Sequence, residues 1–121
     1  MKMTDDFRDG VAIIALEGRI MGGRDATMFH GKVYEYLNGG FKKLVIDLGK
    51  TKWMDSIGMG MLISAMTAVT KNSGSMKIVN VTDNIKSLLT ITRLVSVFET
   101  HDSLDDAINS FNPAGLTAGT S

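Results

Sequence analysis

A run of consecutive apolar residues constrains the fold more than any other part of this chain. It reads Leu44-Val45-Ile46-Asp47-Leu48 and is rich in strand formers. The run lacks the alternation of apolar and polar residues that marks a strand with one wet face, so both of its faces must be covered. We therefore expect a central strand in a sheet that is buried on both sides.

Four further segments are predicted to be strands. Met3 to Phe7 and Val11 to Leu16 flank an Asp9-Gly10 pair, which tolerates the positive φ angles of a tight turn. These two segments should form an N-terminal hairpin. Met76 to Val81 is another β-rich run, and Val97 to Thr100 is expected as a short edge strand.

Four segments show the apolar spacing of amphipathic helices. The first follows Gly22-Gly23 and ends at Asn38-Gly39-Gly40, where glycine allows the left-handed exit. The second is predicted from Gly58 to Thr70, after a loop from Gly49 to Met54 that delivers Ser56 to the helix start.

The last two helices are recognised by their caps. Asp83 is expected to cap the third. Ser103 and Asp106 resemble a capping box that opens the fourth, which extends to Phe111. The resulting order, β-β-α-β-α-β-α-β-α, predicts the α/β class with right-handed crossovers.

One domain accommodates these elements. We expect it to span residues 1–111, with a mixed sheet of about five strands, a parallel core and about four helices. Residues 112–121 contain the only proline together with Gly, Thr, Ala and Ser, and too little apolar surface to offset the entropy of ordering. They are predicted to be a disordered tail.

Composition narrows the classes of partner and site. Thirteen basic and thirteen acidic side chains cancel, so we expect neither nucleic acid nor a membrane as partner. The absence of cysteine removes disulfides and thiolate chemistry and suits the cytoplasm. His30 and His101 sit in no ligand-spaced cluster, so no metal is assigned, and no motif indicates a cofactor.

The informative segment runs from Leu44 to Ile63, where a buried strand leads to Ser56 at the start of a glycine-punctuated helix. An Asp-Ser pair in such a place is most often a helix cap. Gly58 and Gly60 each cost the helix about 1 kcal/mol relative to alanine, so close approach of another surface is one explanation for them. Five apolar residues surround the serine, and some of them should be exposed: Trp53, Met54, Ile57, Met59 and Met61.

The element Asp55-Ser56-Ile57-Gly58-Met59-Gly60, in its strand-loop-helix context, resembles the signature of STAS domains, the family of sulfate transporters and anti-sigma-factor antagonists. Weaker similarity extends over nearly the whole chain. It includes Glu17-Gly18-Arg19-Ile20, the central strand with Asp47, and the strand-helix pair from Met76 to Leu94.

The resemblance implies an anti-sigma-factor antagonist and no enzymatic activity of its own. Such a domain binds an anti-sigma factor with serine-kinase activity, frees the sigma factor, and is inactivated when the kinase phosphorylates the motif serine. Here that residue is Ser56. A phosphatase of the PP2C type would reverse the modification.

The residues expected to contact the partner lie around that serine: Asp55, Ile57, Gly58, Met59, Gly60 and Ile63. Asp55 could orient the hydroxyl or pair with a basic group of the kinase, or simply cap the helix. Met59 and Ile63 are four residues apart and could form one apolar stripe, unless either is buried.

Two alternatives stay open. One is a STAS scaffold or interaction subunit that is never phosphorylated, as in stressosome-like or transporter-associated assemblies. The other is a small serine hydrolase, which the sequence disfavours because Met54 replaces the first glycine of the Gly-x-Ser-x-Gly motif. That chemistry would require a base within hydrogen-bond reach of Ser56 and a pocket beside it.

Overall fold

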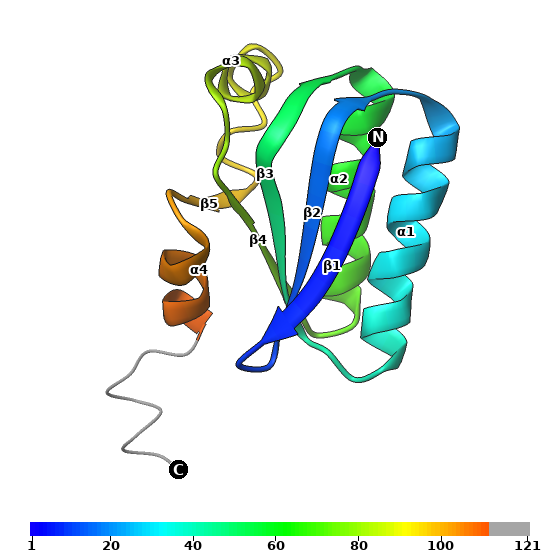
Figure 1. Cartoon of the computed structure of the whole chain (residues 1–121), viewed down its shortest axis with the longest axis vertical. Helices are drawn as coiled ribbons and strands as arrows, with labels where there is room; N and C mark the ends of the chain where they lie inside the picture. The colour runs from blue at the N-terminus through cyan, green and yellow to red at the C-terminus, as the bar shows by residue number, and fades with distance from the viewer. Residues whose placement is uncertain (112–121) are drawn as a thin grey trace.

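The run that anchored the prediction lies in β3 (Lys43–Met54), the central strand of a five-stranded sheet. The computed structural model describes residues 1–111 (Figure 1). The strands are arranged β1-β2-β3-β4-β5; the first pair is antiparallel and the other pairs are parallel. The other strands are β1 (Lys2–Arg8), β2 (Val11–Ile20), β4 (Ser75–Val79) and β5 (Glu99–His101). The predicted mixed sheet with a parallel core is confirmed.

The N-terminal hairpin is also confirmed. β1 and β2 pair from Lys2 opposite Glu17 to Arg8 opposite Val11. Asp9 and Gly10 both have positive φ, at 55° and 78°, which matches the right-handed twist of a two-residue hairpin turn.

Helices cover both faces of the sheet. α1 (Gly22–Asn38) and α2 (Ser56–Lys71) lie on one side, and α3 (Asp83–Ile91) and α4 (Leu104–Phe111) lie on the other (Figure 1). Crossover helices place the parallel strands between two helical layers, as expected for this class. In the described residues, no helix is both long and apolar enough to span a membrane.

Alternate residues of β3 contribute side chains to two separate hydrophobic cores, one on each face of the sheet. Leu44 and Ile46 belong to the larger core, which packs beneath α1 and α2. Val45 points to the other face and joins a smaller core with Ala107 and Ile108 of α4. The non-alternating run therefore reflects burial on both faces.

The predicted loop from Gly49 to Met54 is wrong. These residues continue β3, because β2 extends past Leu16 to Ile20 and pairs with them as far as Ile20 opposite Met54. The backbone groups of the segment are thus satisfied by the neighbouring strand. As a consequence, a single residue separates β3 from α2, which begins at Ser56.

Two other local predictions also need correction. The cap of α3 is Thr82 and not Asp83, since the Thr82 hydroxyl accepts the Ile85 N–H. β5 is shifted to Glu99–His101, while Phe98 turns inward and is buried. Ser103 does accept the N–H of Asp106, as predicted. The tail predicted for residues 112–121 lies outside the described residues.

Candidate functional site

The turn between β3 and α2 is fixed by Asp55. Its Oδ1 atom accepts the backbone N–H of Gly58 at 2.8 Å, so Asp55 is the N-cap of α2. Its own N–H donates to the Ile20 carbonyl at 3.2 Å, which ties the turn to the end of β2. Of the roles considered for Asp55, the structure shows helix capping.

Ser56 is the first residue of α2 and its side chain is exposed. Within residues 1–111, its hydroxyl makes no hydrogen bond to another group, because Asp55 performs the capping. The first N–H groups of a helix have no carbonyl partner within it and carry partial positive charge. Ser56 is therefore a free hydroxyl at the positive end of a helix.

The two glycines of the motif differ in the space that a side chain would find at each position. A Cβ at Gly58 would lie 3.0 Å from the Met54 Cβ and 3.1 Å from the Ile20 Cγ2, so close packing of α2 on the strand ends excludes a side chain. A Cβ at Gly60 would meet nothing within 4 Å. Packing within the described chain thus accounts for Gly58 but not for Gly60.

The apolar residues around Ser56 divide into core and surface. Met54, Met59 and Met61 are buried and belong to the larger core; Met59 is 5% exposed. Ile57, by contrast, is 50% exposed, and Trp53 is also exposed. The expectation that part of this group is exposed is confirmed by Ile57 and Trp53 alone.

A continuous stripe of α2 starts at the serine. Ser56, Gly60 and Ile63 follow one another at spacings of four and three residues, so they share one face of the helix. Each of them is partly or fully exposed. Met59 lies outside this stripe because its side chain turns toward the sheet, and the stripe that paired Met59 with Ile63 is not formed.

Sequence reasoning missed a pair of residues next to this turn. The Arg19 guanidinium lies 5.3 Å from the centroid of the Trp53 ring, and the two residues are register partners on β2 and β3. A guanidinium group in this position is attracted to the negative face of the aromatic ring, which is a cation–π interaction. The pair could have been recognised only from the register of the two strands. Because residues 49–54 were predicted to be a loop, Trp53 was not placed opposite Arg19.

Neither histidine is placed to act as a base for the Ser56 hydroxyl. His30 Nε2 lies 3.3 Å from the carbonyl oxygen of Met61, and His101 Nε2 lies 2.6 Å from Glu99 Oε2. The two rings are thus engaged elsewhere, and the described residues place no histidine base on Ser56. Within residues 1–111 there is also no group of three His, Cys, Asp or Glu side chains that could hold a metal ion.

A separate polar cluster joins α4 to the sheet. Lys77, which is buried, forms an ion pair with Glu99 at 2.9 Å and donates a hydrogen bond to the Ser110 hydroxyl. Hydrogen bonding to His101, and then to Lys77, holds the pKa of Glu99 below its ordinary value. Glu99 and Ser110 both approach Nε2 of His101, unlike a catalytic triad, in which the acid and the serine engage different ring nitrogens.

Known proteins resemble both the sequence and the fold. A family model described as STAS domain matches residues 2–107. A protein of Thermotoga maritima with the provisional name of anti-sigma factor antagonist is 21% identical over 108 residues, which cover 88% of this chain and 91% of that protein.

Solved structures support the same architecture. The crystal structure of an anti-sigma factor antagonist from Mycobacterium paratuberculosis superposes with a TM-score of 0.77 at 22% identity, covering 90% of this chain and 92% of the other. The phosphorylated form of the Bacillus cell-fate determinant SpoIIAA gives a TM-score of 0.71 at 14% identity, over 92% of this chain and 100% of the other. At these identities the likeness concerns the fold.

Proposed function

Since this chain belongs to the STAS domain family, we propose that it is an anti-sigma factor antagonist whose binding is switched off by phosphorylation of Ser56. The observation that carries the proposal is the setting of that serine. Its hydroxyl is exposed, has no partner among residues 1–111, and stands beside the exposed Ile57. A kinase could reach this group without unfolding any element.

The proposed contact surface is this stripe of α2, which is exposed at Ser56 and partly exposed at Gly60 and Ile63, together with Ile57. It consists of Ser56, Ile57, Gly60 and Ile63, with Asp55 beneath it as the cap. Gly60 supports this choice, because a glycine that internal packing does not explain leaves room for a partner to approach the helix closely. Gly58 and Met59 support the surface from the core and do not contribute exposed side chains to it.

Phosphorylation would spoil this surface without disturbing the fold. It adds about −1.5 to −2 charges near pH 7, which the positive end of α2 tolerates. The same charge inside an apolar contact must be desolvated, at a cost of several kcal/mol. A loss of about 3 kcal/mol weakens binding on the order of a hundredfold.

The proposed partner is an anti-sigma factor with serine-kinase activity, and a PP2C-type phosphatase would restore the active form. Two relatives named as anti-sigma factor antagonists support the class of partner. A related fold is known in phosphorylated and unphosphorylated forms, which supports the type of regulation. The protein itself would be a substrate and not a catalyst.

Intact-mass spectrometry tests the proposal. The purified protein is incubated with ATP and the serine-kinase anti-sigma factors of its own organism, with Ser56→Ala as the control. We expect one added phosphate on the wild type and none on the variant. If a kinase that binds the protein leaves Ser56 unmodified, the switch is contradicted in favour of a constitutive scaffold or interaction subunit.

A further inference from the structure

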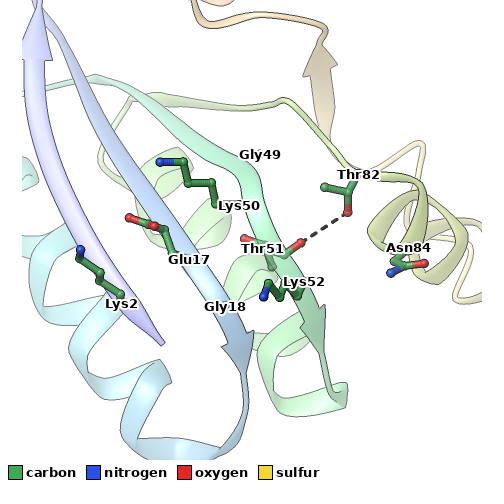
Figure 2. A pocket seen from close by; sticks show the side chains of 9 residues that line it. All are labelled: Lys2, Glu17, Gly18, Gly49, Lys50, Thr51, Lys52, Thr82 and Asn84. Atoms are coloured by element: carbon green, nitrogen blue, oxygen red, sulfur yellow. Dashed lines mark hydrogen bonds between the residues drawn. The ribbon is translucent and has the colours of Figure 1, made fainter.

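A cavity on the face of the sheet opposite α1 and α2 has no part in the function proposed above. Its volume is about 760 Å³, which is within the range of small-molecule sites. It lies over the start of β1 and the C-terminal parts of β2 and β3, beside the start of α3 (Figure 2). The lining residues are Lys2, Glu17, Gly18, Gly49, Lys50, Thr51, Lys52, Thr82 and Asn84.

The cavity concentrates positive charge. Lys2, Lys50 and Lys52 line it with Glu17 as the one acidic residue, although the whole chain has no net charge. Among residues 1–111, none of these three ammonium groups has a hydrogen bond or an ion pair. The lysines are thus available to a bound anion.

Irregular strand pairing accompanies the two β3 lysines that line this cavity, Lys50 and Lys52. Between Ala15 and Glu17, and again between Gly18 and Arg19, the register with β3 shifts. β3 contains one residue more than β2 at each shift, which marks β-bulges. Bulges are rare between parallel strands and commonly re-aim side chains next to functional sites. Lys50 follows the first of these shifts, and Lys52 is the extra residue of the second.

The wall and floor of the cavity are already formed. The Thr82 hydroxyl lies 3.5 Å from the carbonyl oxygen of Thr51 while accepting the Ile85 N–H, so the start of α3 is tied to β3 (Figure 2). Gly18 and Gly49 contribute backbone without side chains. Gly18 has φ of +86°, a conformation that other residues rarely adopt.

The polar groups are distributed unevenly along the cavity. In the strand register Glu17 lies between Lys2 of β1 and Lys50 of β3, so two cations flank the carboxylate. Asn84 belongs to α3 and Lys52 lies on the side of the cavity toward that helix, where no acidic residue lines the cavity (Figure 2). The end with Lys52 and Asn84 therefore favours an anion. The end with Glu17 offers a carboxylate as hydrogen-bond acceptor and the Lys2 and Lys50 ammonium groups as donors.

From this arrangement we propose that the cavity binds a small phosphorylated polyol, of the sugar-phosphate class. The phosphate lies against Lys52 and the Asn84 amide, since lysine is a common phosphate ligand. The hydroxyl groups lie against Glu17, which accepts their hydrogen bonds. No aromatic side chain lines the cavity, so it has no platform on which a nucleotide base could stack.

Titration of the isotope-labelled full chain by NMR tests this site, with glucose 6-phosphate, glucose, inorganic phosphate and ATP as probes. We expect glucose 6-phosphate to shift the Gly18, Gly49 and Thr51 amides saturably and to bind more tightly than the other three. If none of the probes shifts these amides up to roughly 10 mM, or if ATP or inorganic phosphate binds as tightly as glucose 6-phosphate, the proposal is overturned.

Two variants and a matched control assign the ends of the cavity. Lys52→Gln should weaken glucose 6-phosphate binding roughly tenfold, because a charge-assisted contact to the phosphate is lost. Glu17→Gln should reduce the preference for glucose 6-phosphate over inorganic phosphate. Lys71→Gln removes an exposed lysine of α2 outside the cavity and should leave binding unchanged. An equal loss in Lys71→Gln and Lys52→Gln would mean general charge attraction and would refute a defined site.

Discussion

Asp55 and Gly58 are joined by a 2.8 Å hydrogen bond from the glycine N–H to the aspartate Oδ1, and this contact leaves Ser56 free between them. A serine at the start of a helix commonly has to cap it. Here its neighbour does so, and the Ser56 hydroxyl points to no internal partner among the described residues. The division of roles separates the stability of the turn from the chemistry of the serine.

Removing the cap should therefore cost stability, whereas removing the serine should not. Asp55→Ala is expected to lower the free energy of unfolding by about 1 kcal/mol, because the Gly58 N–H loses its acceptor. Ser56→Ala should change it by less than about 0.5 kcal/mol. Urea denaturation of both variants measures the difference, and a larger loss in Ser56→Ala would contradict the assignment of the cap.

The two glycines of α2 provide a matched pair for steric analysis. Gly58→Ala should destabilise the fold by about 1 to 3 kcal/mol, because the new methyl group would press against Met54 and Ile20. Gly60→Ala should stabilise it by up to about 1 kcal/mol, since the site is open and alanine favours helix. In thermal and chemical denaturation, the unfolding midpoint should fall for Gly58→Ala and rise for Gly60→Ala.

The same Gly60 variant separates stability from binding. If a partner approaches α2 closely at this position, Gly60→Ala should weaken the complex with the anti-sigma factor even though the fold becomes more stable. Calorimetric titration of the folded variant would show this. Unchanged affinity would mean that the open space at Gly60 is not used by the partner.

Ile57 should contribute apolar contact beside the serine. Ile57→Ala is expected to weaken partner binding about tenfold, because the side chain is half exposed in the free protein and would be buried in the complex. Ile91→Ala is the control, since Ile91 is also exposed but belongs to α3 on the other side of the sheet. Equal losses in both variants would place the contact surface elsewhere.

The contacts of Glu99 predict a dependence on pH. Its pKa is lowered from the ordinary value of 4.5 in the folded protein by the hydrogen bond to His101 and then by Lys77. A depressed carboxylate pKa gives stability that is present above the unfolded value and is lost as the pH falls through the folded one. Solvent screens this half-exposed side chain, so the effect is small.

Glu99→Gln supplies the comparison. The difference in unfolding free energy between the wild type and this variant should be present above pH 4.5 and should shrink as the pH is lowered below it. Chemical denaturation across the acidic range measures the difference. A gap that stays constant through this range would show that ionisation of Glu99 does not contribute to folding.

Local sequence patterns were sufficient for most of the architecture. The apolar run of β3 predicted a strand covered on both faces, and the Asp9-Gly10 pair predicted the hairpin. Both signals are contained within a few residues. The extension of β3 to Met54 was not recognised because it depends on pairing with β2, and the register shifts there break any simple period.

At the candidate site, too, local sequence patterns did not reveal features that depend on how distant elements pack together. The sequence identified Ser56 and its glycines, but it could not divide the neighbouring apolar residues between core and surface. Met59 is buried and Ile57 exposed because of how α2 is rotated on the sheet, which is a property of the packed fold. Likewise, Lys2 and Lys52 are brought to one cavity only by the strand order.

Phosphate on Ser56 should block partner binding, and a comparison of two binding affinities tests this. The protein is prepared with phosphoserine at position 56, and its affinity for the anti-sigma factor that binds the unmodified form is compared with that of the unmodified protein. We expect the phosphorylated protein to bind about a hundredfold more weakly, with the fold and its unfolding midpoint retained. Equal affinity of the two forms would contradict it.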